Sequence, residues 1–262
     1  MISRKFIVEW TGVVPWSEPK QVEQDLIITR ALLNLYEHPI LKETLAFRGG
    51  TALNKLFFPE AFRYSEDIDL VQITPQPIGP TISLIREIID PWLGTPKRTA
   101  SGFLATLSYR TTSDEGFPLK LKIEINTREH FSVVGFKKHQ FSSGSSWAPG
   151  SVTMVTYAIE ELLGTKMRAL YQRRKGRDIF DLYTAITTLQ NIDTNLVVSC
   201  FLEYMARANQ QISREAFLAN IEEKLKTKDF HGDIIPLLPK QKKSFDSTIA
   251  YEYLREKLFN KL

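Results

Sequence analysis

Two short segments of the chain constrain its fold more than any others: a small-residue turn at residues 47–55 and an aspartate pair that follows it. The turn reads Phe-Arg-Gly-Gly-Thr-Ala-Leu-Asn-Lys. Asp67 and Asp69 then alternate with Ile68 and Leu70. In a strand, residues i and i+2 project from the same face, about 6.5–7 Å apart along the chain. The pattern therefore predicts a strand with two carboxylates on one face and aliphatic side chains on the other.

The turn and the aspartate pair together suit a nucleoside triphosphate and its metal ion. Thr51 is expected to cap a helix that starts at the turn, and backbone N–H groups at a helix N-terminus bind phosphate. The two carboxylates supply the oxygen ligands that Mg²⁺ prefers. Because each motif alone is common, the hypothesis depends on their combination. The alternative is a solvated turn beside an ordinary exposed acidic strand.

Length and composition restrict the class of protein. With 262 residues, the chain can form one large domain or two small ones. It has no apolar run long enough to span a bilayer and no N-terminal pattern of a secretion signal. The single cysteine, Cys200, excludes an internal disulfide and a cysteine-rich zinc site, and it is expected to be a buried, inert thiol. We therefore expect a cytoplasmic protein that does not bind membranes.

The net charge of +4 is unevenly distributed along the chain. Residues 1–131 carry 15 basic and 16 acidic side chains, whereas residues 132–262 carry 19 and 14. The densest basic run contains Lys166, Arg168, Arg173, Arg174, Lys175 and Arg177 without an acid among them. Such a run can bind the phosphates of a nucleotide or a nucleic acid. The alternative is the solvated face of a helix.

The sequence pattern changes near residues 150–157. Helical periodicity at 21–46 and 81–93 is followed by an alternating β pattern at 103–128, with a turn at 113–116 and a Ser/Gly-rich loop expected at 136–151. Five helices are expected after the change, at 159–173, 177–189, 194–207, 214–226 and 244–261. The sequence thus predicts an α+β fold: a mixed α/β domain over residues 1–156 and a helical domain over 157–262.

Glu124 is a candidate third acid. It lies on the polar face of a run, residues 119–126, whose other face is wholly aliphatic. A third carboxylate can help hold a second ion, and two ions about 3.5–4 Å apart can clamp attacking and leaving oxygens. We expect an antiparallel strand that carries Glu124 beside Asp67 and Asp69. The alternative is an exposed glutamate paired across a hairpin.

Lys166 is placed unusually for a lysine. It falls on or beside the inward face of its predicted helix, where an unpaired ammonium group would be costly. Asp178 and Asp181 share one side of the next helix and are candidate partners. Lys166 and Asp178 could form a purely structural clamp, or Lys166 could contact triphosphate oxygens while Asp178 orients it. The residues leave both possibilities open.

Several of these segments, in this order, resemble the AbiEii/AbiGii-type nucleotidyltransferase toxins, the toxin half of bacterial abortive-infection and toxin–antitoxin pairs. The matching segments are Gly49-Gly50-Thr51, Ser65-x-Asp67-Ile68-Asp69-Leu70, Lys122–Asn126, the helix with Lys166, and Arg177-Asp178-Ile179-Phe180-Asp181-Leu182. The resemblance covers roughly residues 25–190. It implies a DNA polymerase β-like nucleotidyltransferase core with a mixed sheet and flanking helices, followed by a helical C-terminal domain.

The resemblance also implies roles for individual residues. Asp67 and Asp69 would be Mg²⁺ ligands, and Glu124 stands where the wider superfamily often keeps its third catalytic acid. The triphosphate would be contacted by Gly49, Gly50, Thr51 and Ser65. Lys166 and Asp178 would complete the site from the helical half, so the pocket is expected between the two parts of the chain.

The implied reaction is attack by a 3′-hydroxyl, or another acceptor oxygen, on the α-phosphate of an NTP, with pyrophosphate leaving. Relatives implicate an RNA acceptor, the tRNA 3′ end, and a cognate antitoxin as partner. One alternative keeps the chemistry but transfers the nucleotide to a protein side chain. Another is a non-catalytic module of the same fold that binds nucleotide or RNA.

Overall fold

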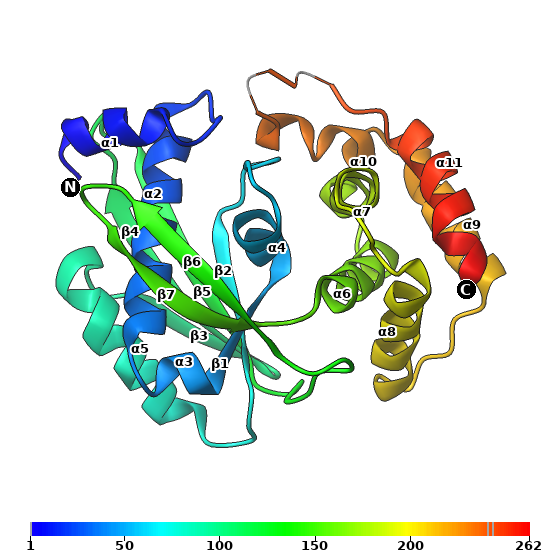
Figure 1. Cartoon of the computed structure of the whole chain (residues 1–262), viewed down its shortest axis with the longest axis horizontal. Helices are drawn as coiled ribbons and strands as arrows, with labels where there is room; N and C mark the ends of the chain where they lie inside the picture. The colour runs from blue at the N-terminus through cyan, green and yellow to red at the C-terminus, as the bar shows by residue number, and fades with distance from the viewer. Residues whose placement is uncertain (1, 240, 243) are drawn as a thin grey trace. The chain divides into compact units, whose positions relative to one another are not determined.

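The computed structural model describes residues 2–239, 241–242 and 244–262. The chain divides into two compact units, Met1–Tyr157 and Ala158–Leu262. Figure 1 shows the first unit in blue to green and the second in green to red. Among the described residues, no helix is both long and apolar enough to cross a membrane.

The first unit is built on a seven-stranded mixed sheet in the order β3-β4-β5-β2-β1-β7-β6. The strands are β1 (Leu45–Arg48), β2 (Asp67–Gln72), β3 (Lys97–Ser101), β4 (Leu104–Thr112), β5 (Pro118–Asn126), β6 (Lys137–Gly144) and β7 (Pro149–Thr156). The β2–β5 and β1–β7 pairs are parallel, and the other neighbouring pairs are antiparallel. The sheet therefore mixes hairpins with crossover connections.

The helices of this unit are α1 (Arg4–Thr11), α2 (Pro19–Glu37), α3 (Leu41–Thr44), α4 (Gly49–Phe57) and α5 (Ile78–Leu93). They pack on the sheet, except α1, which packs on α2. Helix α2 contacts β5, β6 and β7 and is buried over most of its length, whereas α4 contacts β1, β2 and β6. Because α4 follows β1 directly, its N-terminus lies beside the end of that strand.

The alternating patterns predicted two strands well. The aliphatic face of β5 is buried, and Ile68 and Leu70 of β2 are at most 1% exposed. The prediction of a loop at 136–151 was wrong, because β6 and β7 pair there as an antiparallel hairpin. Serine and glycine favour strands weakly, so this hairpin depends on its pairing partners rather than on its composition. The predicted helix over 21–46 ends at Glu37, before Pro39, and is followed by α3 and β1.

The second unit consists of helices. They are α6 (Ile159–Gln172), α7 (Gly176–Thr188), α8 (Thr194–Arg207), α9 (Arg214–Leu225), α10 (Lys228–Gly232) and α11 (Ser247–Lys257), with short 3₁₀ turns at Ile235–Leu237 and Phe259–Lys261. Helix α6 packs closely on α8, because a Cβ at Gly164 would lie only 2.8 Å from that of Cys200. Cys200 is buried as expected, and burial raises the pKa of its thiol to about 12. An un-ionised thiol is a poor nucleophile.

Candidate active site

The register between β2 and β5 brings the predicted acids of the sheet unit to adjacent positions. Asp67 pairs with Lys122 and Asp69 pairs with Glu124 across the two strands. Partners in register project from the same face, so all four side chains share one side of the sheet. Glu124 thus lies beside the aspartate pair as predicted, but its strand is parallel to β2 rather than antiparallel. The direction is set by the chain path through the β4–β5 hairpin, which side-chain alternation does not encode.

These carboxylates share a partly desolvated environment. Burial, together with the charges of Asp69 and Glu124, raises the pKa of Asp67 to about 6. The ammonium of Lys122 opposes this shift, and its Nζ lies 2.7 Å from Glu124 Oε2. Burial lowers the pKa of Lys122, but the hydrogen bond to Glu124 and the two aspartates raise it overall. One ammonium group therefore offsets only part of the negative charge of the three carboxylates.

The two aspartates fit a hard divalent cation. Their donors are carboxylate oxygens, the ligands that Mg²⁺ prefers. The pKa of Asp67 is raised first by burial and then by neighbouring negative charge, and a bound cation would offset that charge. Across the described residues, however, no three His, Cys, Asp or Glu side chains form a group that could hold a metal ion. Glu124 is instead engaged by Lys122. A third metal ligand is thus not assembled in this arrangement.

Gly49 connects the turn to the second aspartate. Its φ of +82° lies in the left-handed region that favours glycine. A Cβ at this position would lie 2.1 Å from Asp69 Oδ2, so any side chain would displace the carboxylate. Gly50, the next residue of α4, is buried. The Gly-Gly turn therefore makes room for Asp69 at the N-terminus of α4.

Thr51 occupies a different position from the one predicted. Helix α4 begins at Gly49 with Arg48 as its cap residue, so Thr51 is the third residue of the helix and the predicted N-cap was wrong. Its buried hydroxyl donates to the carbonyl oxygen of Asp67 at 2.5 Å, and the oxygens of Thr51 and Ser65 lie 2.7 Å apart. Since Thr51 has a single hydroxyl proton, Ser65 donates to it. The two hydroxyls tie α4 to the start of β2.

Sequence reasoning missed Arg48 and Glu129. Arg48 lies opposite Asp69 in the β1–β2 register, and its Nη1 donates to Glu129 Oε2 at 2.6 Å. Burial lowers the pKa of Arg48, but Glu129 and Asp69 are among the charges that raise it overall. A permanent cation thus lies near the aspartate pair. The position of Arg48 in the sequence, between an apolar strand and the Gly-Gly turn, is the signal that could have identified it as a site residue.

In the helical unit, Lys166 has the partners that its position demands. Its Nζ lies 2.8 Å from Asp181 Oδ2 and 3.4 Å from Asp178 Oδ1, and both aspartates are fully buried. Arg173 donates to both oxygens of Asp178, at 2.7 and 2.8 Å. The expected pairing of Lys166 with the aspartates of the next helix is therefore present, as a cluster of two cations and two carboxylates, and it is compatible with both roles considered for Lys166.

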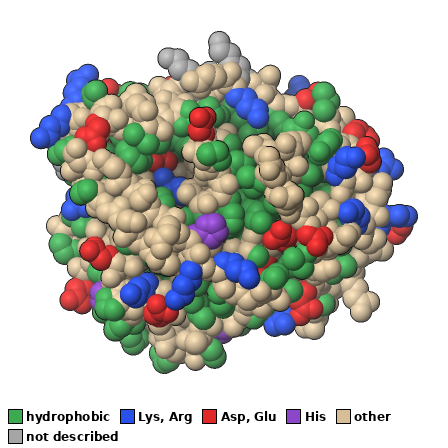
Figure 2. All heavy atoms as spheres, in the orientation of Figure 1, with side chains coloured by type: hydrophobic (Ala, Val, Ile, Leu, Met, Phe, Trp, Pro, Cys, Tyr) green, Lys and Arg blue, Asp and Glu red, His purple; other side chains and the backbone are tan. Residues whose placement is uncertain are grey.

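The rest of the basic run is partly neutralised within the same unit. Lys175 and Arg177 both pair with Asp233, at 3.3 and 2.9 Å. Although burial opposes the change, hydrogen bonds from Arg177 lower the pKa of Asp233 to about 2. On the face shown in Figure 2, basic and acidic side chains are interspersed. Much of this run thus pairs with acids of its own unit.

Comparison with known proteins decides the family. A family model described as the nucleotidyl transferase AbiEii toxin of a Type IV TA system matches residues 30–251. The chain belongs to the AbiEii toxin family. It is therefore a nucleotidyltransferase of a toxin–antitoxin family, which confirms the resemblance inferred from the sequence. No curated protein sequence matches the chain significantly.

Solved structures show the same fold as this AbiEii family member. MenT4, a nucleotidyltransferase toxin from Mycobacterium tuberculosis H37Rv, is 15% identical with a TM-score of 0.59, over 100% of this chain and 98% of that one. JHP933 from Helicobacter pylori is also 15% identical, with a TM-score of 0.54 over 94% and 95% of the two chains. The predicted fold class, a mixed sheet with flanking helices and a helical C-terminal part, is confirmed.

Replacing Gly49 tests whether the turn positions Asp69 in the AbiEii enzyme. The Gly49→Ala side chain would overlap the Asp69 carboxylate, and a displacement of about 1 Å can lower a rate about 100-fold. We expect such a loss in transfer from an α-labelled NTP. Gly94→Ala is the matched control, because Gly94 has a φ of +85° but open space around its Cβ. Unchanged transfer by Gly49→Ala would contradict this role.

The raised pKa of Asp67 predicts a pH-dependent stability in metal-free buffer. Between its usual value of 3.8 and about 6, the folded state binds the Asp67 proton more tightly than the unfolded state. This group's contribution to stability is therefore lost as the pH rises from about 4 to about 6. We therefore compare the free energy of unfolding of Asp67→Asn with that of the wild type. The difference should favour the variant more at pH 8 than at pH 4, by on the order of 1–2 kcal/mol. Urea unfolding with EDTA measures this difference, and an equal difference at both pH values would refute it.

Proposed function

We propose that this nucleotidyltransferase is Mg²⁺-dependent and transfers NMP from an NTP to an RNA acceptor, the tRNA 3′ end. In this proposal the chain acts as a toxin whose effect a cognate antitoxin counters. The observation that supports it most is the β2–β5 register, which places Asp67, Asp69 and Glu124 on one face beside the N-terminus of α4. Family membership supports the transfer chemistry, and the basic second half of the sequence is compatible with an RNA acceptor.

In this proposal the sheet unit binds the metal and the triphosphate. Asp67 and Asp69 hold Mg²⁺, which neutralises charge on the phosphoryl group during transfer. Gly49, Gly50 and Thr51 offer backbone N–H groups of the first turn of α4, which have no partner within the helix. The Thr51 side chain itself braces the site, because its hydroxyl is bonded to Asp67. Ser65 contributes a triphosphate contact from beside this brace.

Lys122 determines whether Glu124 can join the metal site. As a metal ligand, Glu124 would have to exchange the Lys122 ammonium, 2.7 Å away, for the cation. Arrival of a divalent ion beside Asp67 and Asp69 favours this exchange, because it replaces one positive charge with two. We therefore propose Glu124 as a third metal ligand and catalytic acid that is recruited when the metal binds.

We also propose a functional division of the chain. Residues 1–156 form the nucleotidyltransferase core domain, and residues 157–262 form a helical C-terminal domain that contributes Lys166 and Asp178. In this role Lys166 contacts triphosphate oxygens, while Asp178 and Asp181 keep its ammonium charged and oriented. The same contacts also suit a purely structural clamp, so Lys166 requires a test that separates the two roles.

Asp67→Asn and Asp69→Asn test the metal and catalytic assignment. Each change removes a carboxylate charge while keeping the side-chain shape, so transfer from α-labelled NTP to total RNA should be abolished and growth arrest relieved. Asp114→Asn, an exposed aspartate of the same unit, is the matched control. Treating the labelled product with RNase or with protease identifies the acceptor. Full transfer by both variants would exclude the metal role, and a protease-sensitive label would exclude RNA.

A double replacement separates the two roles of Lys166. Lys166→Met alone should destabilise the helical unit by about 3–5 kcal/mol, because it removes the ammonium that pairs with the buried negative charge of Asp181, whereas Asp178 keeps its bonds to Arg173. Adding Asp181→Leu removes that charge and should restore much of the stability. If Lys166 contacts the triphosphate, the double variant is stable to urea but still transfers nucleotide poorly. Recovery of transfer together with stability would show that Lys166 is only a clamp.

A further inference from the structure

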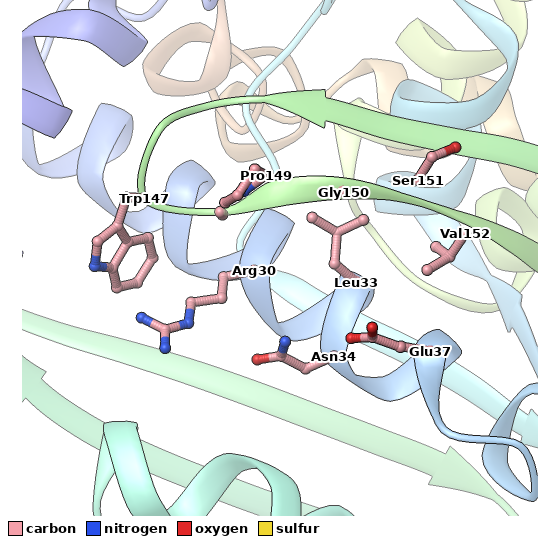
Figure 3. A pocket seen from close by; sticks show the side chains of 10 residues that line it. Arg30, Leu33, Asn34, Glu37, Trp147, Pro149, Gly150, Ser151 and Val152 are labelled. Atoms are coloured by element: carbon pink, nitrogen blue, oxygen red, sulfur yellow. The ribbon is translucent and has the colours of Figure 1, made fainter.

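One stripe of α2 faces two neighbouring hollows in the sheet unit. Glu23, Ile27, Arg30, Asn34 and Glu37 recur along it at helical spacing. Arg30, Asn34 and Glu37 border a hollow of about 210 Å³, whose other side is the β6–β7 turn and the start of β7 (Figure 3). Glu23, Ile27 and Arg30 border a second hollow, of about 120 Å³. Arg30 and the tryptophan of the turn, Trp147, border both hollows.

Arg30 lies against two tryptophans. Its guanidinium carbon is 4.6 Å from the ring centre of Trp92 and 4.4 Å from that of Trp147. The two indole rings meet edge to face, with their centres 5.8 Å apart. Cation–π contacts of this kind hold the guanidinium in place without using its N–H donors on a carboxylate. We call Arg30, Trp92 and Trp147 the arginine cage.

The arginine cage has unused hydrogen-bonding capacity. Within the described part of the chain, Arg30 makes no ion pair, and the two acids of its stripe, Glu23 and Glu37, each stand seven residues away, about 10 Å along the helix. Burial without a partner lowers the pKa of Arg30. Trp92 Nε1 is likewise buried with no hydrogen-bond acceptor among the described residues. Two kinds of donor therefore lack an acceptor beside the hollows.

The surrounding groups restrict what could supply this acceptor. Figure 3 shows Arg30, Asn34 and Glu37 on α2 opposite the segment that carries Trp147 and Ser151. A guanidinium, an amide, a carboxylate and a hydroxyl beside an aromatic wall can bind a phosphate together with the mixed donors and acceptors of a base edge. The hollow is smaller than the usual ligand pocket of about 300–1,000 Å³, and the two flanking glutamates repel a polyphosphate. A single nucleotide fits these limits better than an NTP.

We propose that the arginine cage binds one unpaired nucleotide of the RNA acceptor, with Arg30 on its phosphate and Asn34 on its base. This inference rests on the proposed function, in which the acceptor is RNA. The cage residues are separate from Asp67, Asp69 and Glu124, so the cage contributes to acceptor binding and not to the transfer chemistry.

The test is binding of short single-stranded RNA to the full-length chain. Fluorescently labelled hexauridylate and hexaadenylate are titrated at several salt concentrations, with anisotropy as the readout. Arg30→Gln should weaken binding about tenfold and lower the salt slope by about one, because one phosphate contact is lost. Arg110→Gln, an exposed arginine on β4, is the matched control and should bind as the wild type does. Thermal unfolding verifies that each variant is folded.

Two further variants keep the inference falsifiable if Arg30→Gln is unstable. Asn34→Ala, at a half-buried position of the stripe, should weaken binding and change the preference between the two oligonucleotides. RNA binding should quench tryptophan fluorescence in the wild type, and Trp147→Phe should reduce that quenching. Wild-type binding by Arg30→Gln and Asn34→Ala, an equal loss in Arg110→Gln, or binding of an acidic peptide in place of RNA would overturn the inference.

Asp67→Asn separates this inference from the proposed function. The variant should lose nucleotide transfer but keep its affinity for the oligonucleotides, since Asp67 does not border either hollow. If labelled product proves to be protein while Arg30→Gln still weakens RNA binding, the proposed acceptor is wrong and the cage remains an RNA site. If RNA is labelled but all cage variants bind and transfer normally, the cage inference alone fails.

Discussion

Parallel pairing of β2 with β5 is the interaction on which the chemistry of the sheet unit depends. It places Asp69 beside Glu124 and Asp67 beside Lys122, so like charges are held close together at partly buried positions. Their repulsion is offset by the Lys122 ammonium and, across the β1–β2 register, by the charge of Arg48. A fold that keeps negative charge crowded in this way favours the binding of a cation. The same aliphatic faces that bury the strands therefore keep the acids in position.

Close approach at the turn couples this charge cluster to α4. Gly49 lies against the Asp69 carboxylate, and Thr51 donates to the backbone of Asp67. The first turn of α4 and the start of β2 thus form one packed element, which holds together the proposed phosphate-binding helix end and the proposed metal-binding strand. In the helical unit, the buried carboxylates of Asp178 and Asp181 likewise hold the charged ammonium of Lys166 in a fixed position. The partners that keep its ammonium inside the unit are the ones that would orient it toward a substrate.

The predictability of the site depended on whether a residue's role is local. Alternation along β2 and β5 was sufficient to place Asp67, Asp69 and Glu124 on polar faces, and helical spacing was sufficient to pair Lys166 with Asp178 and Asp181. Thr51 was predicted as a cap, because composition cannot show that its hydroxyl bonds a strand sixteen residues away. The β6–β7 hairpin was missed for a similar reason: its serines and glycines form strands through mutual pairing. Arg30 gave no signal, because its two tryptophans come from distant segments.

The sequence by itself determined the α+β class, the two acidic faces, the pairing of Lys166 with the aspartates of the next helix, and the family resemblance. These follow from periodicity and short motifs, which act over a few residues of the chain. Only the tertiary structure decided the parallel direction of β5, the contact between Gly49 and Asp69, the engagement of Glu124 by Lys122 and the arginine cage. Each of these depends on segments far apart in the chain, whose approach is set by how the whole unit buries its apolar faces.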